Sequence, residues 1–525
     1  MTVESSKQFN IKSVAIIGSG PSGIASLYEL SRLTKDGKSL FGKTDISEYE
    51  KNGDLAFTEL VAFERNKSAG GVWSKSAFGD NNIDPNLPSN ENENIDFSNP
   101  KDIYQNFKID SKLEEKLKNS SQKNPIKIPF TDSIDSIIKN QWRSSAAYNG
   151  LFTNVTNRYM SFSFDEIIGD DLNKLNSKYK HLPNFQSSVD VSNYLENVIK
   201  RNNLEKYIRF NTNVERVKKL DNNKWEVIVN EIIIDNDGKK YLNWYKQIFD
   251  AVIIGNGKTI PIVPNIKGLK EFSKINKDKV NIKLAKSIQD PSFLKSAKKP
   301  LFIGSSVSSI DLLQYTFPRD LEKPSVYISR RALSANSSWV TSASYSKGII
   351  NKPTIKEFIP EKNSILFEDG TIESGFDVII ICTGYHMHYP FLEIPYDKLK
   401  FYKYTFSIDD PTLALVGNTY AGFFFNRVES QGAAIASIWN NNKKLPSNKE
   451  QINDYENAPK MVTGTINSQF ISPLIELAVD GRPHPFSVNK EKTDHVYHQA
   501  VGTSVVLNLF FNIRNGTVDI KDVFN

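Results

Sequence analysis

Residues 13–30, SVAIIGSGPSGIASLYEL, contain an apolar run followed by three glycines in the spacing GxGxxG. The run Val14–Ile17 is mostly β-branched, which predicts a short buried parallel strand. Apolar residues recur with helical spacing from Ile24 to Leu30, so a helix is expected directly after the glycines. This order favours a dinucleotide site, because the N-terminal amides of such a helix can hold a pyrophosphate.

An acidic residue for a ribose hydroxyl follows at the end of the next predicted strand, FTELVAFE (57–64). Glu64 lies 46 residues after Gly18 (64 minus 18), compared with roughly 20 in the compact motif. The polar segment 35–55 is interpreted as an insertion looped out on the surface, which restores the geometry. These residues leave open whether the nucleotide is NAD or FAD, since both use this turn.

A second strand–turn–helix pattern lies in PLFIGSSVSSIDLLQY (300–315). Here Ser306 and Ser309 replace the second and third glycines of the motif that starts at Gly304. Serine is small and offers a hydroxyl donor, so the turn can still receive a phosphate. The competing interpretation is a strand–turn–helix with only a packing role.

Two arginines follow the strand after this second turn. The strand ends at Ser329, 25 residues after Gly304 (329 minus 304), and Arg330 and Arg331 come next. A basic side chain here accommodates the 2′-phosphate of NADP, whereas an acidic one binds the 2′-hydroxyl of NAD. The pair therefore favours NADPH, with a solvated strand end as the alternative.

Strands repeatedly give way to helices along the 525 residues, which predicts an α/β chain with doubly wound parallel sheets. Ligands of such sheets bind at the carboxyl ends of strands. Residues 75–140 are dominated by Asn, Asp, Ser and Lys. They are expected to form a long loop or a partly disordered insert.

Composition excludes several classes of protein. The net charge of +6 comes without a Lys/Arg block interleaved with aromatics, so no nucleic-acid partner is expected. The single cysteine, Cys382, excludes an intramolecular disulfide and a cysteine-based zinc site, and no metal is expected at His495 and His498. No signal peptide or membrane-spanning run is found, so the expected location is cytoplasmic, with association with the ER surface as an open alternative.

The ordered set of motifs resembles the flavin-containing monooxygenases of the fungal type. The segments that carry the resemblance are GSGPSG (18–23), FERNKSAGGVW (63–73), YNGLFTNVTNRYMSFSF (148–164), IRFNTNVERV (208–217), FDAVIIGNG (249–257), GSSVSSID (304–311), FDVIIICTGY (376–385), TLALVG (412–417) and KLPSNKEQ (444–451). They cover most of the chain outside the two polar inserts.

This resemblance implies two Rossmann-like dinucleotide-binding domains, with the NADPH domain inserted into the FAD domain. The first part of the FAD domain would span 1–257, the NADPH domain 258–384, and the second part of the FAD domain with the C-terminal region 385–525. The cofactors implied are FAD and NADPH, with O₂ as co-substrate and a small molecule as substrate. A homodimer is an open alternative.

The resemblance also implies which residues contact the cofactors. Those for FAD are Gly18, Gly20, Pro21, Ser22, Gly23, Glu64, Gly71, Val72, Trp73, Val214, Thr383, Gly384 and Gln431. Those for NADPH are Gly304, Ser305, Ser306, Ser308, Ser309, Ser329, Arg330 and Arg331.

The implied reaction forms a C4a-hydroperoxyflavin, which oxygenates a soft nitrogen or sulfur nucleophile. Asn154 matches an asparagine that holds the oxygenated flavin, and Asn256 is the other candidate amide, each with a turn-forming role as the alternative. The family's aromatic, glycine and histidine before the second turn are absent from KVNIKLAKSIQD (279–290), where Leu284 stands at the histidine position. Weak retention of NADP⁺ would then make the protein an NADPH oxidase.

Two further interpretations stay open. Baeyer–Villiger oxygenation of ketones would need an arginine near the flavin, and Arg158 is a candidate. A catalytically weak flavoprotein could serve as a binding module. A disulfide reductase is excluded, because it needs a redox pair of cysteines.

Overall fold

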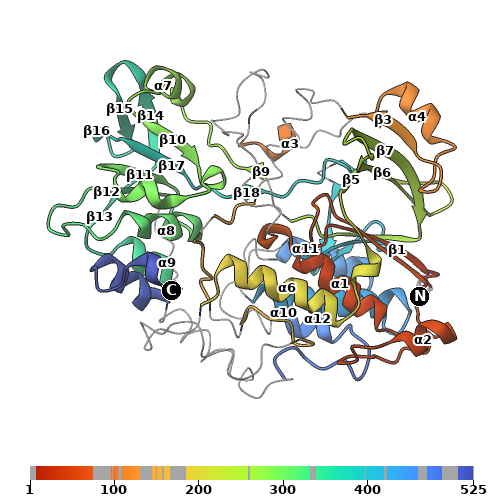
Figure 1. Cartoon of the computed structure of the whole chain (residues 1–525). Helices are drawn as coiled ribbons and strands as arrows, with labels where there is room; N and C mark the ends of the chain where they lie inside the picture. The colour runs from red at the N-terminus through yellow and green to blue at the C-terminus, as the bar shows by residue number, and fades with distance from the viewer. Residues whose placement is uncertain are drawn as a thin grey trace.

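The computed structural model describes residues 8–74, 96, 98–103, 109–130, 145–148, 150–155, 159–165, 185–257, 260–331, 339–395, 398–418, 423–458, 470–487 and 506–523. Two sheets organise these residues, one on each side of the molecule: a larger one that is parallel from β21 to β4 with β19 and β20 added antiparallel, and a smaller one that is all parallel (Figure 1). The larger sheet has seven strands in the order β19-β20-β21-β8-β1-β2-β4. Their bounds are β1 Ser13–Ile17, β2 Glu59–Phe63, β4 Ile208–Arg209, β8 Ala251–Ile254, β19 Phe401–Tyr402, β20 Phe406–Ser407 and β21 Leu413–Leu415.

The smaller sheet has five strands, all parallel, in the order β10-β17-β11-β12-β13. Their bounds are β10 Asn281–Leu284, β11 Pro300–Ile303, β12 Val326–Ser329, β13 Ile349–Lys352 and β17 Val378–Ile381. The central strands are apolar along their whole length, as expected for parallel strands that are covered on both faces.

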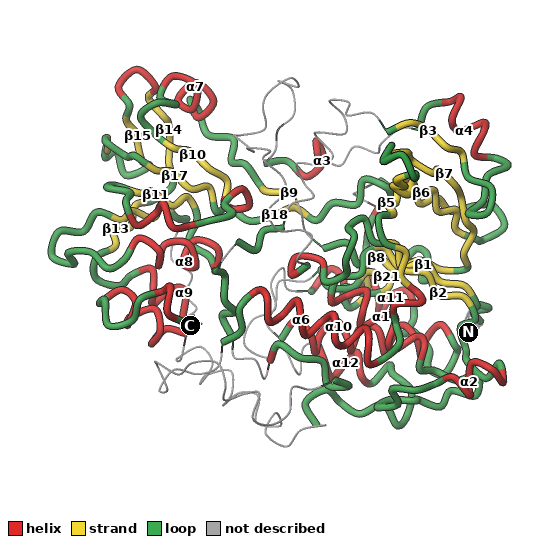
Figure 2. Tube along the Cα trace, in the orientation of Figure 1, coloured by secondary structure: helices red, strands yellow, loops and turns green. Residues whose placement is uncertain are grey.

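Three antiparallel sheets accompany the parallel ones. One contains β3 Ile126–Pro129, β5 Thr212–Lys219, β6 Trp225–Ile234 and β7 Lys240–Phe249, and another contains β14 Ile355–Ile359, β15 Ser364–Phe367 and β16 Ile372–Ser374. The third is the pair β9 Ile260–Pro261 and β18 Tyr385–His386. This pair joins the two halves of the molecule, because the chain leaves the larger sheet just before β9 and returns to it after β18 (Figure 2).

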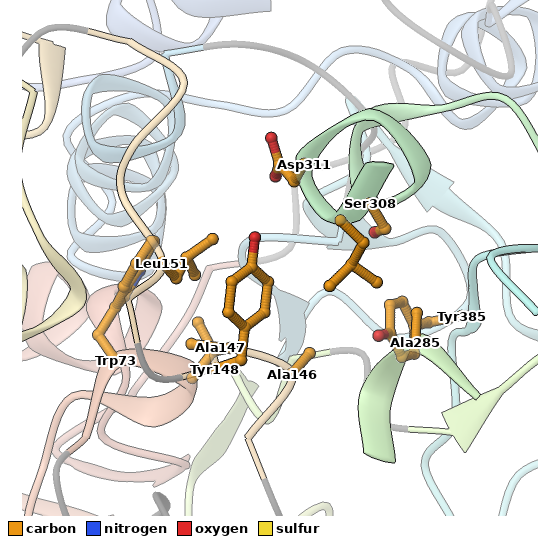
Figure 3. A pocket seen from close by; sticks show the side chains of 11 residues that line it. Trp73, Ala146, Ala147, Tyr148, Leu151, Ala285, Ser308, Asp311 and Tyr385 are labelled. Atoms are coloured by element: carbon orange, nitrogen blue, oxygen red, sulfur yellow. The ribbon is translucent and has the colours of Figure 1, made fainter. Parts of the chain in front are cut away.

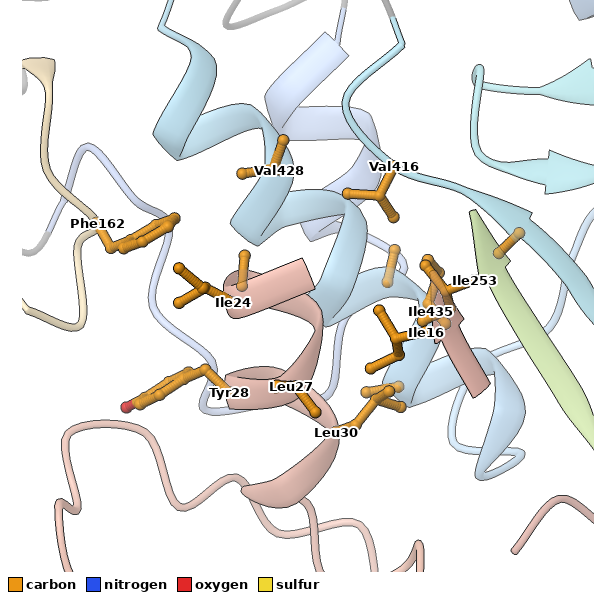
Figure 4. Packing of buried hydrophobic residues seen from close by; sticks show 14 of the residues in the cluster. Ile16, Ile24, Leu27, Tyr28, Leu30, Phe162, Ile253, Val416, Val428 and Ile435 are labelled. Carbon is orange, nitrogen blue, oxygen red and sulfur yellow. The ribbon is translucent and has the colours of Figure 1, made fainter. Parts of the chain in front are cut away.

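Helices and antiparallel strands cover opposite faces of each parallel sheet. On the larger sheet, α1 (Pro21–Ser31) and α10 (Phe424–Trp439) pack over β1 and β8, with Ile16, Ile24 and Ile435 in one core (Figure 4). The opposite face packs on Trp225 and other residues of the β5–β6–β7 sheet. Further helices are α2 Ser47–Asn52, α3 Pro100–Ile103, α4 Ser111–Leu117, α6 Ser188–Arg201, α7 Leu269–Ile275, α8 Val307–Leu313, α9 Trp339–Ser344, α11 Asn448–Asn457 and α12 Ser472–Ile475, and residues 506–514 are also helical.

The prediction of an α/β fold with two Rossmann-like units is confirmed. The five-stranded sheet uses only strands between 281 and 381, whereas the seven-stranded sheet takes strands from both sides of that interval. The exact limits 1–257, 258–384 and 385–525 stay a prediction. No helix in the described part of the chain is long and apolar enough to span a membrane.

The expectation of a long loop or partly disordered insert over 75–140 is wrong for residues 109–130. They form α4 and the edge strand β3, whose residues Ile126 to Pro129 pair antiparallel with Tyr241 to Trp244. A four-residue strand in a polar segment has too few residues for a recognisable strand pattern in the sequence. The strand β3 forms because it pairs with β7. The other polar insert, 35–55, includes α2 and a small apolar cluster of Leu40, Ile46 and Leu55.

Candidate dinucleotide sites and the cavity between them

The first glycine turn leaves no room for side chains. Gly18 has φ +95°, and a Cβ there would lie 2.9 Å from the carbonyl oxygen of Gly255. A Cβ at Gly23 would lie 2.0 Å from the oxygen of Gly18. Helix α1 starts at Pro21, and no side chain caps its first amides. These features form a narrow cradle at the carboxyl end of β1, where the free amides can receive a phosphate.

Glu64 lies beside this cradle although it is distant in sequence. Strands β1 and β2 pair in parallel, with Ile17 opposite Phe63. The Ser19 amide and hydroxyl both donate to Glu64 Oε2 at 2.9 Å, and the Asn66 amide donates to Oε1 at 2.9 Å. Glu64 therefore lies beside the first glycine turn in spite of the insert, and its contact with a ribose stays a prediction.

The Gly70–Gly71 turn closes over the same cradle. The Gly70 amide donates to the Ser19 oxygen at 3.0 Å, and both glycines have positive φ. A Cβ on Gly71 would lie 3.0 Å from the Cα of Gly20. This contact positions Val72, which is exposed, and Trp73, which is half-buried.

Two asparagines with unsatisfied amides follow the adjacent strands β8 and β21. Asn256 donates to the His388 oxygen at 3.0 Å, but its buried Oδ1 has no hydrogen-bond partner. Asn418 is 2% exposed, and neither atom of its amide has a partner. Unsatisfied buried amides are costly, so these two fit a ligand with both donors and acceptors. Asn418 was missed from sequence, where an asparagine directly after the glycine that follows a strand was the available signal.

The other residues expected at FAD lie in different surroundings. Gln431 is fully buried, and its Oε1 accepts from the Gly417 amide at 2.9 Å while its Nε2 donates to Thr405 Oγ1 at 3.0 Å. Val214 is buried in β5, and Thr383 and Gly384 follow β17, where the Gly384 oxygen accepts from the Ile262 amide. Asn154 is half-buried in a loop. The contact of these residues with a flavin stays a prediction.

The second turn repeats the geometry of the first at its glycine. Gly304 has φ +109°, and a Cβ there would lie 2.5 Å from the Cys382 oxygen. Its amide donates to the Ser329 oxygen at 2.9 Å. The serines that follow differ in exposure: Ser305 and Ser308 are half-buried, Ser306 is exposed and Ser309 is fully buried.

The two arginines expected at a 2′-phosphate differ in their environments. Arg330 is 8% exposed, its Nη1 donates to Ser344 Oγ at 2.8 Å, and its guanidinium lies 4.4 Å from the centre of the Tyr345 ring. Arg331 is exposed at the end of β12. Arg330 is thus held by Ser344 and Tyr345, although its buried Nε has no hydrogen-bond partner, and the contact of either arginine with a phosphate stays a prediction.

A cavity of about 170 Å³ lies between the two halves of the molecule (Figure 3). Its lining comes from the Gly70–Gly71 turn region, the loop before α6, helix α8 and β18, and consists of Val72, Trp73, Ala146, Ala147, Tyr148, Leu151, Ala285, Ser308, Asp311, Leu312 and Tyr385. Asp311, which was not among the expected site residues, is the one ionisable carboxylate of this lining. Burial raises its pKa to about 7.

The departure at Leu284 has a structural explanation. Leu284 is 2% exposed and packs in the core between the five-stranded sheet and the β14–β15–β16 sheet. The next residue, Ala285, lines the cavity. Arg158, His495 and His498 lie outside the described residues, and no group of three metal-ligating side chains occurs within them.

The residues at the first turn fit FAD. The glycine cradle, the uncapped start of α1, the Glu64 carboxylate and the unsatisfied amides of Asn256 and Asn418 supply what a flavin dinucleotide needs. At the second turn, Gly304 and the small serines after it are compatible with a nicotinamide dinucleotide.

The sequence matches the family described as flavin-binding monooxygenase-like at residues 143–351 and 342–478. It is 26% identical over 390 residues to dimethylaniline monooxygenase [N-oxide-forming] 2 of Cavia porcellus, covering 59% of this chain and 67% of the relative. It is 23% identical over 381 residues to trimethylamine monooxygenase of Pelagibacter ubique, and the match covers 72% of this chain and 62% of the relative. The fold is shared with S-allyl-L-cysteine S-oxygenase from Allium sativum at a TM-score of 0.58 and 19% identity, over 96% of this chain and 100% of that one.

Proposed function

Because the chain belongs to the flavin-binding monooxygenase-like family, we propose that it is an FAD- and NADPH-dependent monooxygenase of small molecules with a soft nitrogen or sulfur atom. One observation carries this proposal. One small cavity is lined by Val72 and Trp73, which follow the Gly70–Gly71 turn that packs on Gly20, and by Ser308 and Asp311 of α8, the helix that follows Gly304. Such an arrangement suits a reaction that brings two dinucleotides together.

In the proposed reaction, the protein mainly binds and orients. The amides at the start of α1 would hold the FAD pyrophosphate, and Glu64 would accept hydrogen bonds from the adenosine ribose. The sheet order β2-β1-β8-β21 would then place the flavin half beyond β8, near Asn256 and Asn418. Bound FAD supplies hydride acceptance from NADPH and activation of O₂.

Exclusion of water is the second role of the chain. Trp73, Tyr148, Leu151 and Leu312 surround most of the cavity with apolar surface. A dry site limits loss of the activated oxygen to solvent. The contact of Asn154 with the oxygenated cofactor stays part of this proposal.

The test is a set of three measurements on the purified, FAD-loaded protein: NADPH oxidation, H₂O₂ release and transfer of ¹⁸O from ¹⁸O₂. Trimethylamine and dimethyl sulfide serve as probes. NADPH oxidation that either probe accelerates, with ¹⁸O in the product, would support the proposal.

Other outcomes lead to the alternatives. NADPH oxidation with equivalent H₂O₂ and no labelled product would indicate an NADPH oxidase. Labelled ester from cyclohexanone alone would indicate a Baeyer–Villiger enzyme. A flavoprotein that NADPH does not reduce would indicate a binding module.

We further propose a cytoplasmic location. Association with the ER surface and a homodimer stay alternatives that fractionation and sedimentation would decide.

A further inference from the structure

The cavity between the two halves is lined by a carboxyl group that has no ion-pair partner among the described residues. Its wall is largely apolar, and among the described lining residues Asp311 on α8 is the one carboxylate (Figure 3). Asp311 is half-buried, and no ion pair or hydrogen bond joins its carboxylate to any residue that the structure describes. A carboxylate in such a place is costly unless a cation reaches it.

Among the described residues, the titratable groups that interact electrostatically with Asp311 supply no positive charge. Tyr148, Tyr315 and Cys382 interact with it electrostatically, and each of these becomes negative when it ionises. Burial raises the pKa of Asp311 to about 7. The group therefore changes charge near neutral pH and can both bind a cation and accept a proton.

We propose that Asp311 is a specificity-determining residue that binds the ammonium group of a small alkylamine and accepts its proton. This inference rests on the proposed function. The cavity has a volume of about 170 Å³. It suits an amine of a few heavy atoms, whose alkyl groups would contact Trp73, Leu151 and Leu312.

The proton transfer makes the amine nitrogen able to react with an oxygen atom. Most alkylamines are protonated at neutral pH, and a protonated nitrogen has no lone pair for an oxygen atom. The step R₃NH⁺ + Asp–COO⁻ → R₃N + Asp–COOH breaks the N–H bond, forms an O–H bond and leaves the amine nucleophilic. The net reaction R₃N + O₂ + NADPH + H⁺ → R₃NO + NADP⁺ + H₂O then consumes one proton.

The competing assignment is that this end of the cavity belongs to NADPH, since Ser308 and Asp311 are on the helix after the second turn. The two assignments differ in what a neutral substitution changes. An amine site alters the preference between charged and neutral substrates, whereas a cofactor site alters the KM for NADPH.

The test compares wild type, Asp311→Asn and Asp311→Glu in the FAD-loaded protein, with exposed Asp278→Asn as the control. We expect Asp311→Asn to lower the ratio of kcat/KM for trimethylamine to kcat/KM for dimethyl sulfide by about tenfold or more, because the substitution removes one ionic contact with the amine. Asp311→Glu should restore much of the ratio, and Asp278→Asn should not change it. An unchanged ratio, or a rise in the KM for NADPH with both substrates, would overturn the inference.

Binding of tetramethylammonium separates this inference from the proposed function. This cation has no proton and no lone pair, so calorimetry detects the site without turnover. We expect binding to wild type that strengthens as pH rises through about 7 and is lost in Asp311→Asn. If wild type oxygenates neither probe but binds the cation in this way, the proposed function fails and the site stands. Binding that is absent or independent of pH would refute the site, even if Asp311→Asn fails to fold.

Discussion

Gly304 shows how one residue without a side chain can define the backbone of the second glycine turn. Its φ of +109° is strained for any other residue, and a Cβ added here would lie only 2.5 Å from the Cys382 oxygen. Ser306 and Ser309 replace two glycines of the GxGxxG motif. The close approach of Gly304, after β11, to Cys382, after β17, does not depend on them. The turn thus keeps the backbone shape on which phosphate binding depends.

We expect Gly304→Ala to raise the KM for NADPH by about tenfold or more while the bound flavin content is unchanged. The added methyl must displace the turn from Cys382, at a cost of roughly 1–2 kcal/mol from φ alone and more from the clash. Absorbance of the purified protein measures the flavin, and an NADPH titration of flavin reduction measures the KM.

Gly370→Ala is the matched control, because Gly370 has φ +80° and a Cβ added there would have no other atom within 4 Å. Equal effects of the two substitutions would show that conformational strain alone acts and that the second turn has no special role.

At the scale of elements, a buried ion cluster joins the segment 470–487 to two helices. Arg482 donates to Glu29 of α1 at 2.8 Å and to Glu429 of α10 at 3.1 Å, and the side chains of all three are at most 7% exposed. Ser163 also donates its hydroxyl to Glu429 at 2.7 Å. Burial raises the pKa of Glu29, and Arg482 opposes this shift.

We expect Arg482→Met to lower the free energy of unfolding by about 3–5 kcal/mol, because it leaves two carboxylates buried without their cation. Urea denaturation measures the loss. Lys443→Met is the control, since Lys443 pairs at 2.8 Å with Asp480 of the same segment, whose side chain is 95% exposed. An exposed pair contributes at most about 1 kcal/mol, so similar losses in both variants would contradict the interpretation.

At the scale of the molecule, the chain ends against the half with the smaller sheet. Phe510 is 2% exposed and belongs to the core of the five-stranded sheet, with its ring 6.4 Å from that of Phe317. Figure 1 shows this C-terminal part beside α9. The end of the chain therefore stabilises the half that carries the second turn, although residues 401–439 belong to the other half.

We expect Phe510→Ala to destabilise the smaller-sheet half by about 3–5 kcal/mol, through the lost contacts and the cavity left behind. Hydrogen exchange should accelerate at Leu301–Ile303 of β11 more than at Val14–Ile17 of β1. The partly buried neighbour Phe511 provides the comparison, with a smaller effect for Phe511→Ala. Equal acceleration at both strands would show that the two halves unfold together.

The sequence alone predicted the strands that end in glycine turns, the helices after them and the two Rossmann-like units. These features are local: a β-branched run, a position that needs positive φ and a helical repeat lie within about 18 residues at each turn. For the same reason Gly18 and Gly304 were recognised correctly as parts of turns, and both have positive φ.

The tertiary structure decided what depends on contacts between distant residues. It brought Glu64 to Ser19 across an insert, paired β3 with β7, directed Arg330 to Ser344 and placed Asp311 on the cavity wall. None of these has a local signal, because strand pairing, burial and electrostatic isolation are set by neighbours far away in sequence. Short stretches of residues determined the turns, whereas the packing of the whole chain determined the environment of each charged side chain.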